Sequence, residues 1–200
     1  MTNQELYDLG KQIAPFFAGV FAYGASKLLD QWKNRKRRCN VSADISKNTT
    51  ILSKLIEARL LADCDRVKLY QFYNGDFYVS GQSIVKCAVT HMSVKPGVAP
   101  QVGGDNSYQI PIGWLHDIVK PLLSAKFYHL ITEELQDSDW KATKLLNEDR
   151  ALHIVRLGSP SNMRGFLEIA WHDDTAKMTP EIEKEIIMIV DQLNGVLIQG

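Results

Sequence analysis

The side chains that could carry acid–base chemistry or bind a metal are scattered along this chain. It has five histidines: His91, His116, His129, His153 and His172. No two of them lie at the spacing of a metal site. Residues 172–174, His-Asp-Asp, are the one cluster of a histidine with two carboxylates, and they lie where a strand is expected to end. Turns favour aspartate, so a solvated turn explains this cluster better than a metal or acid–base site does.

The cysteines and the catalytic motifs that the sequence lacks also indicate a protein without enzymatic chemistry. The three cysteines, Cys39, Cys64 and Cys87, are too few for a disulfide framework and contain no Cys-x-x-Cys pair. They predict free thiols in a reducing compartment, although Cys39, beside a basic run, is also a candidate for palmitoylation. The chain has no nucleophile elbow and no phosphate-binding glycine loop. We therefore expect a protein that is not an enzyme and that uses no metal and no cofactor.

Aromatic side chains gather on an expected strand and just beyond it. Tyr70, Phe72, Phe77 and Tyr78 are candidates for the lining of a ligand pocket, because such pockets are mostly apolar and aromatic. Core packing between neighbouring strands is the alternative explanation for the same residues. The sequence leaves both open.

The N-terminal region is apolar and then strongly basic. Residues 12–26 carry no charge, and five basic residues follow: Lys33, Arg35, Lys36, Arg37 and Arg38. A helix over about residues 9–32, with Lys27 reaching the headgroups, is typical of a single membrane span. The basic residues would contact anionic lipid and place residues 33–200 in the cytoplasm. An interfacial helix and a helix packed on the soluble domain remain alternatives; a signal peptide would carry its charges first.

Small residues recur at every fourth position of this segment: Gly10, Ala14, Ala18, Ala22 and Ser26. Such a stripe lets the backbones of two helices approach closely in lipid, where no hydrophobic effect drives association. We therefore expect the membrane helix to self-associate into a homo-oligomer.

Charge separates the two parts of the chain. Residues 1–40 carry seven basic and three acidic side chains, and because the net charge of the chain is zero, the remainder carries −4. A mildly acidic domain is a poor partner for nucleic acid, whose binding depends on neutralising phosphates. The expected organisation is a membrane segment over 1–32, a basic linker over 33–44 and a globular domain over 45–200.

The globular part predicts an α+β domain. In order, the expected elements are a helix over 42–62, strands over 66–73 and 84–94, a helix over 112–124 broken or kinked at Pro121, a strand over 127–132, a helix over 140–150, a hairpin of 152–157 and 163–172, and a last helix capped by Thr179. The apolar side of the first helix is expected to be Ile45, Leu52, Leu55, Ile56 and Leu60. That of the last is Ile182, Ile186, Ile189, Val190, Leu193 and Leu197.

The closing segment carries a family resemblance. Residues 163–171 read Met-Arg-Gly-Phe-Leu-Glu-Ile-Ala-Trp, and residues 178–186 read Met-Thr-Pro-Glu-Ile-Glu-Lys-Glu-Ile. This glycine-led strand and Thr-Pro-Glu helix cap, with the element order over 45–198, resemble the GAF and PAS superfamily of sensory domains. The resemblance implies an α/β sandwich, an antiparallel sheet with its first and last helices together on one face, that binds a ligand or a partner. The residues of cyclic-nucleotide GAF domains and a bilin-attachment cysteine are missing, so no ligand is implied.

A second resemblance is to the holin of T-even bacteriophages. That family also has a short N-terminal segment, one membrane helix and an α/β domain with a Tyr-x-Phe strand, here residues 70–72, and a glycine-led strand, here 165–171. It implies an oligomer in the bacterial inner membrane that times lysis, with a periplasmic domain that binds an antiholin, a regulatory protein. The basic run instead favours a cytoplasmic domain. Topology therefore separates the two interpretations.

Overall fold

The computed structural model describes residues 26, 41–77, 83–99 and 110–198. The chain divides into two units, Met1–Ile45 and Ser46–Gly200, and the fold that follows is that of the second. The expected membrane helix and basic run lie outside the described residues, apart from Ser26, which is helical and exposed. Within the described ranges, no helix combines the length and apolar character that a membrane crossing needs.

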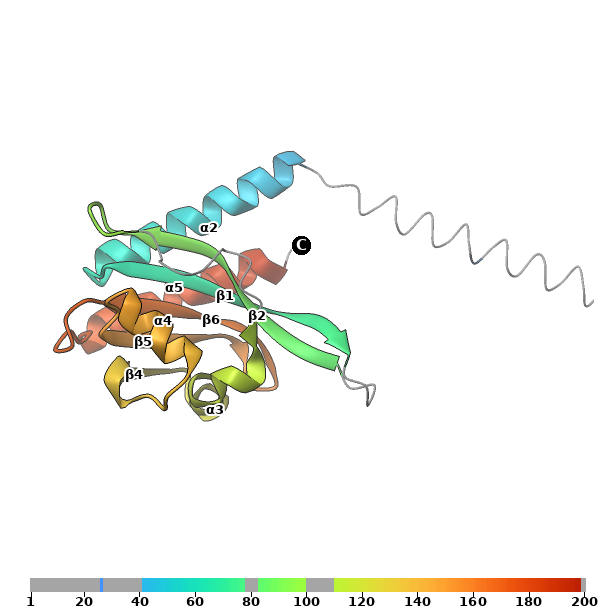
Figure 1. Ribbon diagram of the computed structural model, residues 1–200. Helices are drawn as coiled ribbons and strands as arrows, with labels where there is room; N and C mark the ends of the chain where they lie inside the picture. Colours follow the sequence, from blue (N-terminus) through green and yellow to red (C-terminus); the bar gives the residue numbers. More distant parts are fainter. Residues whose placement is uncertain (1–25, 27–40, 78–82, 100–109, 199–200) are drawn as a thin grey trace, which may run out of the picture. The chain divides into compact units, whose positions relative to one another are not determined.

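A six-stranded sheet forms the centre of this unit (Figure 1). The strands lie in the order β3-β2-β1-β6-β5-β4, and every neighbouring pair is antiparallel. Their bounds are β1 (Arg66–Phe77), β2 (Ser83–Val94), β3 (Ile110–Pro111), β4 (Phe127–Ile131), β5 (Ala151–Ser159) and β6 (Asn162–Trp171). The two central strands, β1 and β6, are far apart in sequence, so the sheet is complete only when the C-terminal hairpin has joined it.

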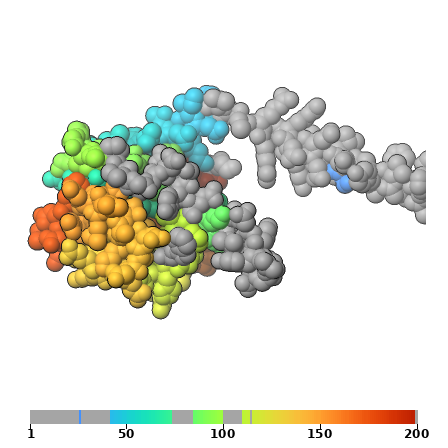
Figure 2. Space-filling model, viewed as in Figure 1, coloured from blue at the N-terminus to red at the C-terminus, as the bar shows by residue number. Residues whose placement is uncertain are grey.

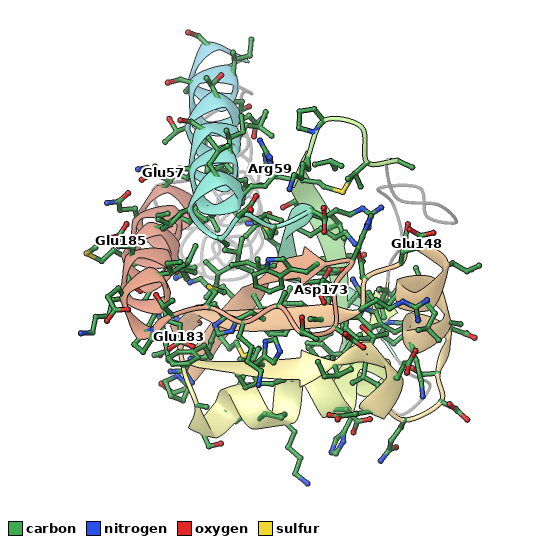
Figure 3. All side chains as sticks on the ribbon, turned by 90° about the vertical axis from the view of Figure 1, so that its left-hand side faces the viewer. Glu57, Arg59, Glu148, Asp173, Glu183 and Glu185 are labelled. Atoms are coloured by element: carbon green, nitrogen blue, oxygen red, sulfur yellow. The ribbon has the colours of Figure 1, made fainter. Side chains whose placement is uncertain are left out.

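Helices α2 (Val41–Leu61) and α5 (Pro180–Ile198) cover one face of the sheet, and Figure 3 shows both on the same side of it. The predicted cap and apolar stripe of α5 are confirmed. The Thr179 hydroxyl accepts the backbone N–H of Ile182 at 3.4 Å. The residues of α5 buried against the sheet are Ile186, Ile189, Val190 and Leu193.

The predicted apolar side of α2 is wrong. The residues that enter the core are Ile51, Leu55 and Ala58, of which only Leu55 was expected there. The other predicted members stay exposed: Ile45 at 60%, Leu52 at 41%, Ile56 at 46% and Leu60 at 65%. The helix has two apolar stripes, and the sheet takes the one that contains the small Ala58, because a small side chain lets the helix approach closely.

Three short helices cover the opposite face, and Figure 2 shows this part of the chain spread over that side of the domain. They are η1 (Ile112–Leu115), α3 (His116–Ser124) and α4 (Asp139–Leu146), and a further 3-10 turn, η2 (Thr132–Glu134), follows β4. The helix expected over 112–124 is a 3-10 turn over Ile112–Leu115 followed by α3, and α3 continues through Pro121 without a break. Helix α4 is shorter than predicted and β3 was not predicted.

Candidate functional site

Two of the four aromatic residues predicted to line a pocket lie together beneath α3 and α4. Tyr70 and Phe72 alternate along β1 and both contact Phe166 of β6. The Tyr70 ring stacks on Phe166 with centroids 4.5 Å apart, and Phe72 meets Phe166 edge-on at 6.1 Å. Tyr70 is only 2% exposed, so its ring packs in the core, the alternative that the sequence left open. Tyr78 and the side chain of Phe77 lie outside the described residues.

Beside these aromatic rings lies a cluster of charged side chains that sequence analysis missed. Its members, called here the buried charge cluster, are Arg66, Lys68, Lys144, Asp149 and Glu168. Arg66 and Lys68 precede Tyr70 on the same face of β1, and Glu168 lies on β6 opposite Lys68. No side chain of the cluster is more than 3% exposed. Charged side chains are almost never buried to this extent unless they are paired.

Asp149 holds one half of the cluster together. Its Oδ1 accepts a hydrogen bond from Arg66 at 2.5 Å, and its Oδ2 accepts one from Lys68 at 3.1 Å. The turn after α4 positions it: Glu148 has a φ of 58°, and the Asp149 N–H then donates to the carbonyl of Lys144 at 3.0 Å. Arg66 also donates to the carbonyl of Asn147 at 2.6 Å. The end of α4 is thereby fixed to the start of β1.

Glu168 holds the other half. Its Oε1 accepts a hydrogen bond from Lys144 and lies 3.4 Å from the Lys68 ammonium. Lys144 also lies 3.3 Å from the Tyr70 hydroxyl and 4.6 Å from the centre of the Trp140 ring. Lys144 thus contacts both a carboxylate and two aromatic side chains, and it connects α4 to the centre of the sheet.

The cluster contains three cations and two anions, so it carries an excess positive charge away from water. Burial opposes ionisation of Asp149, but the charges of Lys144, Lys68 and Arg66 outweigh it and lower the Asp149 pKa. For Lys68 the two carboxylates outweigh burial and raise the pKa. Lys144 differs: burial, with Lys68 nearby, lowers its pKa to about 8 despite Glu168. The excess charge is most easily relieved by deprotonation of Lys144.

This arrangement gives the stability of the protein an unusual pH dependence. Native Lys144 releases its proton near pH 8, whereas an unfolded lysine keeps its proton to about 10.5. Between these values the unfolded state binds more protons at this lysine, so the contribution of Lys144 to the free energy of unfolding rises with pH. We expect Lys144 to contribute a gain of about 2 kcal/mol between about pH 7 and about pH 9.5. The raised pKa values of the buried thiols Cys64 and Cys87 lower the stability over the same range, so the gain is measured as the difference between the urea-unfolding profiles of the parent and of Lys144→Met.

Lys144→Met should remove that gain, because methionine has a similar length and does not titrate. Lys126→Met is the matched control: Lys126 pairs with Asp191 at the surface at 2.8 Å, and its loss should leave the pH profile unchanged. Parallel pH profiles for the parent and for Lys144→Met over this range would contradict the assignment of the lowered pKa to Lys144.

The residues that sequence analysis considered for acid–base, metal or thiol chemistry lie in a turn or in the core. Asp173 accepts the backbone N–H of Thr175 at 2.9 Å and its hydroxyl at 2.8 Å, as expected for a turn. Cys64 and Cys87 are free and buried, and burial raises the pKa of Cys64 to about 12 and that of Cys87 further still. Among the described residues, no group of three histidine, cysteine or acidic side chains could hold a metal.

A hollow of about 610 Å³ opens where β1 and β6 separate. The pairing of these strands ends at Gln71 and Gly165, and beyond it β1 continues alongside β2. The hollow is lined by Gln71, Phe72, Tyr73, Val85, Thr90, Asn162, Met163, Arg164 and Leu197. Its size is within the range of small-molecule sites. Phe72, which sequence analysis placed in a pocket, is one of its lining residues.

No protein-family model and no curated protein matches this sequence. Solved structures do match it in fold. The blue-light-absorbing form of the PixJ GAF domain of Thermosynechococcus elongatus superposes with a TM-score of 0.59 at 16% identity, covering 80% of this chain and 89% of its own. This is a GAF-like fold. The phycocyanobilin-bound GAF domain of a cyanobacterial phytochrome gives 0.56 at 17% identity, covering 87% and 93%. The photoproduct state of GAF3 from Slr1393 of Synechocystis gives 0.57 at 16% identity, covering 76% and 94%.

At these identities the likeness establishes the fold alone. It confirms the predicted class: the GAF-like domain is an α+β sandwich whose antiparallel sheet carries its first and last helices on one face. The small-residue stripe and the five basic residues at 33–38 lie outside the described residues, apart from Ser26. Their contribution to membrane binding and to assembly stays a prediction.

Proposed function

We propose that this chain is a membrane-anchored, self-associating, non-catalytic protein that presents its GAF-like domain as a ligand- or partner-binding signal-input module. The observation that carries the proposal is the GAF-like fold, which it shares with domains of light-absorbing receptors such as PixJ. The anchor is the helix expected over about residues 9–32, and the basic run that follows it contacts anionic lipid on the cytoplasmic side.

The non-catalytic part of the proposal is supported by where the titratable groups lie. General acid–base catalysis needs a side chain that reaches the substrate. The lysines and carboxylates of the buried charge cluster instead pair with one another, with at most 3% of any side chain exposed. They stabilise the domain and present no group to a substrate.

The ligand of this module is held without a covalent bond to Cys64 or Cys87. A cysteine attacks as the thiolate, and burial keeps both thiols protonated by raising their pKa. The hollow between β1 and β6 is the candidate site, because it combines aromatic side chains with Arg164 and polar groups in a volume suited to a small ligand.

Topology is the test of the anchor. The full chain is fused at Gly200 either to a phosphatase that is active only in the periplasm or to a fluorescent protein that is active only in the cytoplasm. We expect membrane-associated protein with a silent phosphatase and a bright fluorescent fusion. Replacing the five basic residues at 33–38 with asparagine should raise the phosphatase activity at least tenfold, because these charges set the orientation.

The opposite results are equally informative. An active phosphatase on the parental chain would overturn the cytoplasmic assignment and favour the T-even holin alternative, whose domain is periplasmic. A chain that stays in the soluble fraction after lysis would overturn the anchor itself.

A further inference from the structure

The hollow between β1 and β6 contains an arginine whose charge is not paired. Arg164 lies on β6, is half-buried, and forms no hydrogen bond or ion pair within the part of the chain that the structure describes. The other arginines of the described ranges are all bonded: Arg59 to Ser93, Arg66 to Asp149, Arg150 to Glu133 and Arg156 to main-chain carbonyls. A half-buried guanidinium without a partner indicates that a bound molecule supplies the anion.

The turn between β5 and β6 holds Arg164 in place at the hollow. Gly158 in this turn has a φ of +89°, a conformation that glycine adopts without strain. The Arg156 side chain donates to the Gly158 carbonyl at 3.2 Å and to the Ala125 carbonyl at 3.0 Å, which ties the turn to the end of α3. Because its support is fixed before any ligand arrives, Arg164 loses little freedom on binding one.

The rest of the hollow offers apolar surface. Val85 is 39% exposed although β2 is an inner strand of the sheet, and it lines the hollow together with Phe72, Met163 and Leu197. The edge-on contact of Phe72 with Phe166 fixes its ring. An apolar ligand body placed here would remove this surface from water, which stabilises the complex in proportion to the area covered.

The hollow is separate from the core beneath α3 and α4. That core is filled by the stacked rings of Tyr70 and Phe166 and by the buried charge cluster, no side chain of which is more than 3% exposed. The hollow instead joins the two faces of the sheet, since Leu197 packs with the core under α2 and α5 and Met163 with the core on the opposite face. A ligand in the hollow therefore contacts both layers of the domain.

We propose that the hollow binds a small carboxylic acid with an apolar body, whose carboxylate pairs with Arg164 and whose body covers Val85 and Phe72. A guanidinium matches a carboxylate in a bidentate pair. Among the described lining residues Arg164 carries the only charge, so one negative charge is balanced, whereas the dianion of a phosphate ester is not. The proposal rests on the proposed function, because it names the ligand class of the binding module.

Fluorine NMR titration of the full chain in phosphatidylcholine nanodiscs tests the proposal, with empty nanodiscs to correct for partition into lipid. The probe is para-fluorocinnamate, and para-fluorocinnamamide is its matched neutral analogue of the same shape. We expect the carboxylate to bind at least tenfold more tightly than the amide. Equal affinities of the two probes, or no binding of the carboxylate at millimolar concentration, would overturn the proposal.

Two variants assign the site. Arg164→Gln should weaken binding of the carboxylate at least tenfold and leave the amide unchanged, while Arg150→Gln, at an exposed arginine paired with Glu133, should change neither. Val85→Asp should also weaken carboxylate binding at least tenfold, because it places a like charge in the hollow, and its thermal unfolding midpoint reports whether the domain still folds. Full affinity in Arg164→Gln would contradict the pairing of the carboxylate with this arginine.

Competing ligands identify the source of the acid. Displacement of the probe by laurate but not by phenylpropionate would assign the body to a fatty acid, and the reverse to an aromatic acid; both results support a carboxylate site. Tighter binding of phenyl phosphate than of para-fluorocinnamate would overturn the preference for one negative charge. Charge-dependent binding by a chain whose domain proves periplasmic would leave this inference standing while the proposed function fails. Equal probe affinities in a chain of the expected topology would overturn this inference alone.

Discussion

Replacing Asp149 with alanine is expected to lower the free energy of unfolding by about 3–5 kcal/mol, because it leaves buried cations without their partner. Asp149 bonds Arg66 at 2.5 Å and Lys68 at 3.1 Å, and neither it nor Lys68 has any exposed side-chain surface. After the substitution, three cations share the single carboxylate of Glu168. Such a loss is a large fraction of the stability of an ordinary domain. Urea unfolding of the full chain, followed by circular dichroism, measures it.

Asp191→Ala is the control for this substitution. Asp191 pairs with Lys126 at 2.8 Å, but its side chain is 62% exposed, so its loss should cost about 0.5 kcal/mol or less. The effect of Asp149 should also depend on acid. Its lowered pKa means that its contribution is complete above the ordinary value of 3.8 and disappears as the pH falls through the lower native value. A loss below about 1 kcal/mol for Asp149→Ala at neutral pH would contradict a dehydrated cluster.

The buried charge cluster is also what the sequence was least able to predict. Arg66 and Lys68 alternate with Val67 and Leu69, and this alternation is normally read as a strand with one face in water. The charged face is buried only because α4 and the turn after it cover it, and that closure depends on residues more than 70 positions away in sequence. The aromatic residues were noticed on their own, without the ions packed beside them.

Helices and strands whose sequence signals lie close together along the chain were predicted well. Helix α5 has its cap, its first proline and its apolar stripe within 19 consecutive residues, and all three are found as expected. For helix α2, the local sequence pattern does not predict which side is buried. Its sequence fits two apolar stripes, and only the approach of the sheet decides which one is buried. Of the residues of this helix that the sequence assigned to the core, only Leu55 is buried.

Substitution of a single glycine should produce the second large loss of stability. Gly165 of β6 lies opposite Gln71 at the last pair between the two central strands, and its φ is +156°. A Cβ at this position would overlap the carbonyl oxygen of Tyr70 and lie 2.9 Å from its carbonyl carbon. Backbone atoms of a central strand cannot rotate away as a side chain can. Overpacking and backbone strain each cost about 1–3 kcal/mol, so Gly165→Ala is expected to cost about 3–5 kcal/mol.

Gly195→Ala is the same substitution at another position, and we expect it to change the free energy of unfolding in the opposite direction. Gly195 lies inside α5, and a Cβ there would meet nothing within 4 Å. Because alanine is the better helix former, this substitution should raise the free energy of unfolding by about 1 kcal/mol. Opposite shifts of the two urea midpoints would support the close approach of β1 and β6, the pairing of distant segments on which the GAF-like sheet depends. If Gly165→Ala were as stable as the parent, these two backbones could not lie together as described, and the hollow that opens where they separate would lose its framework.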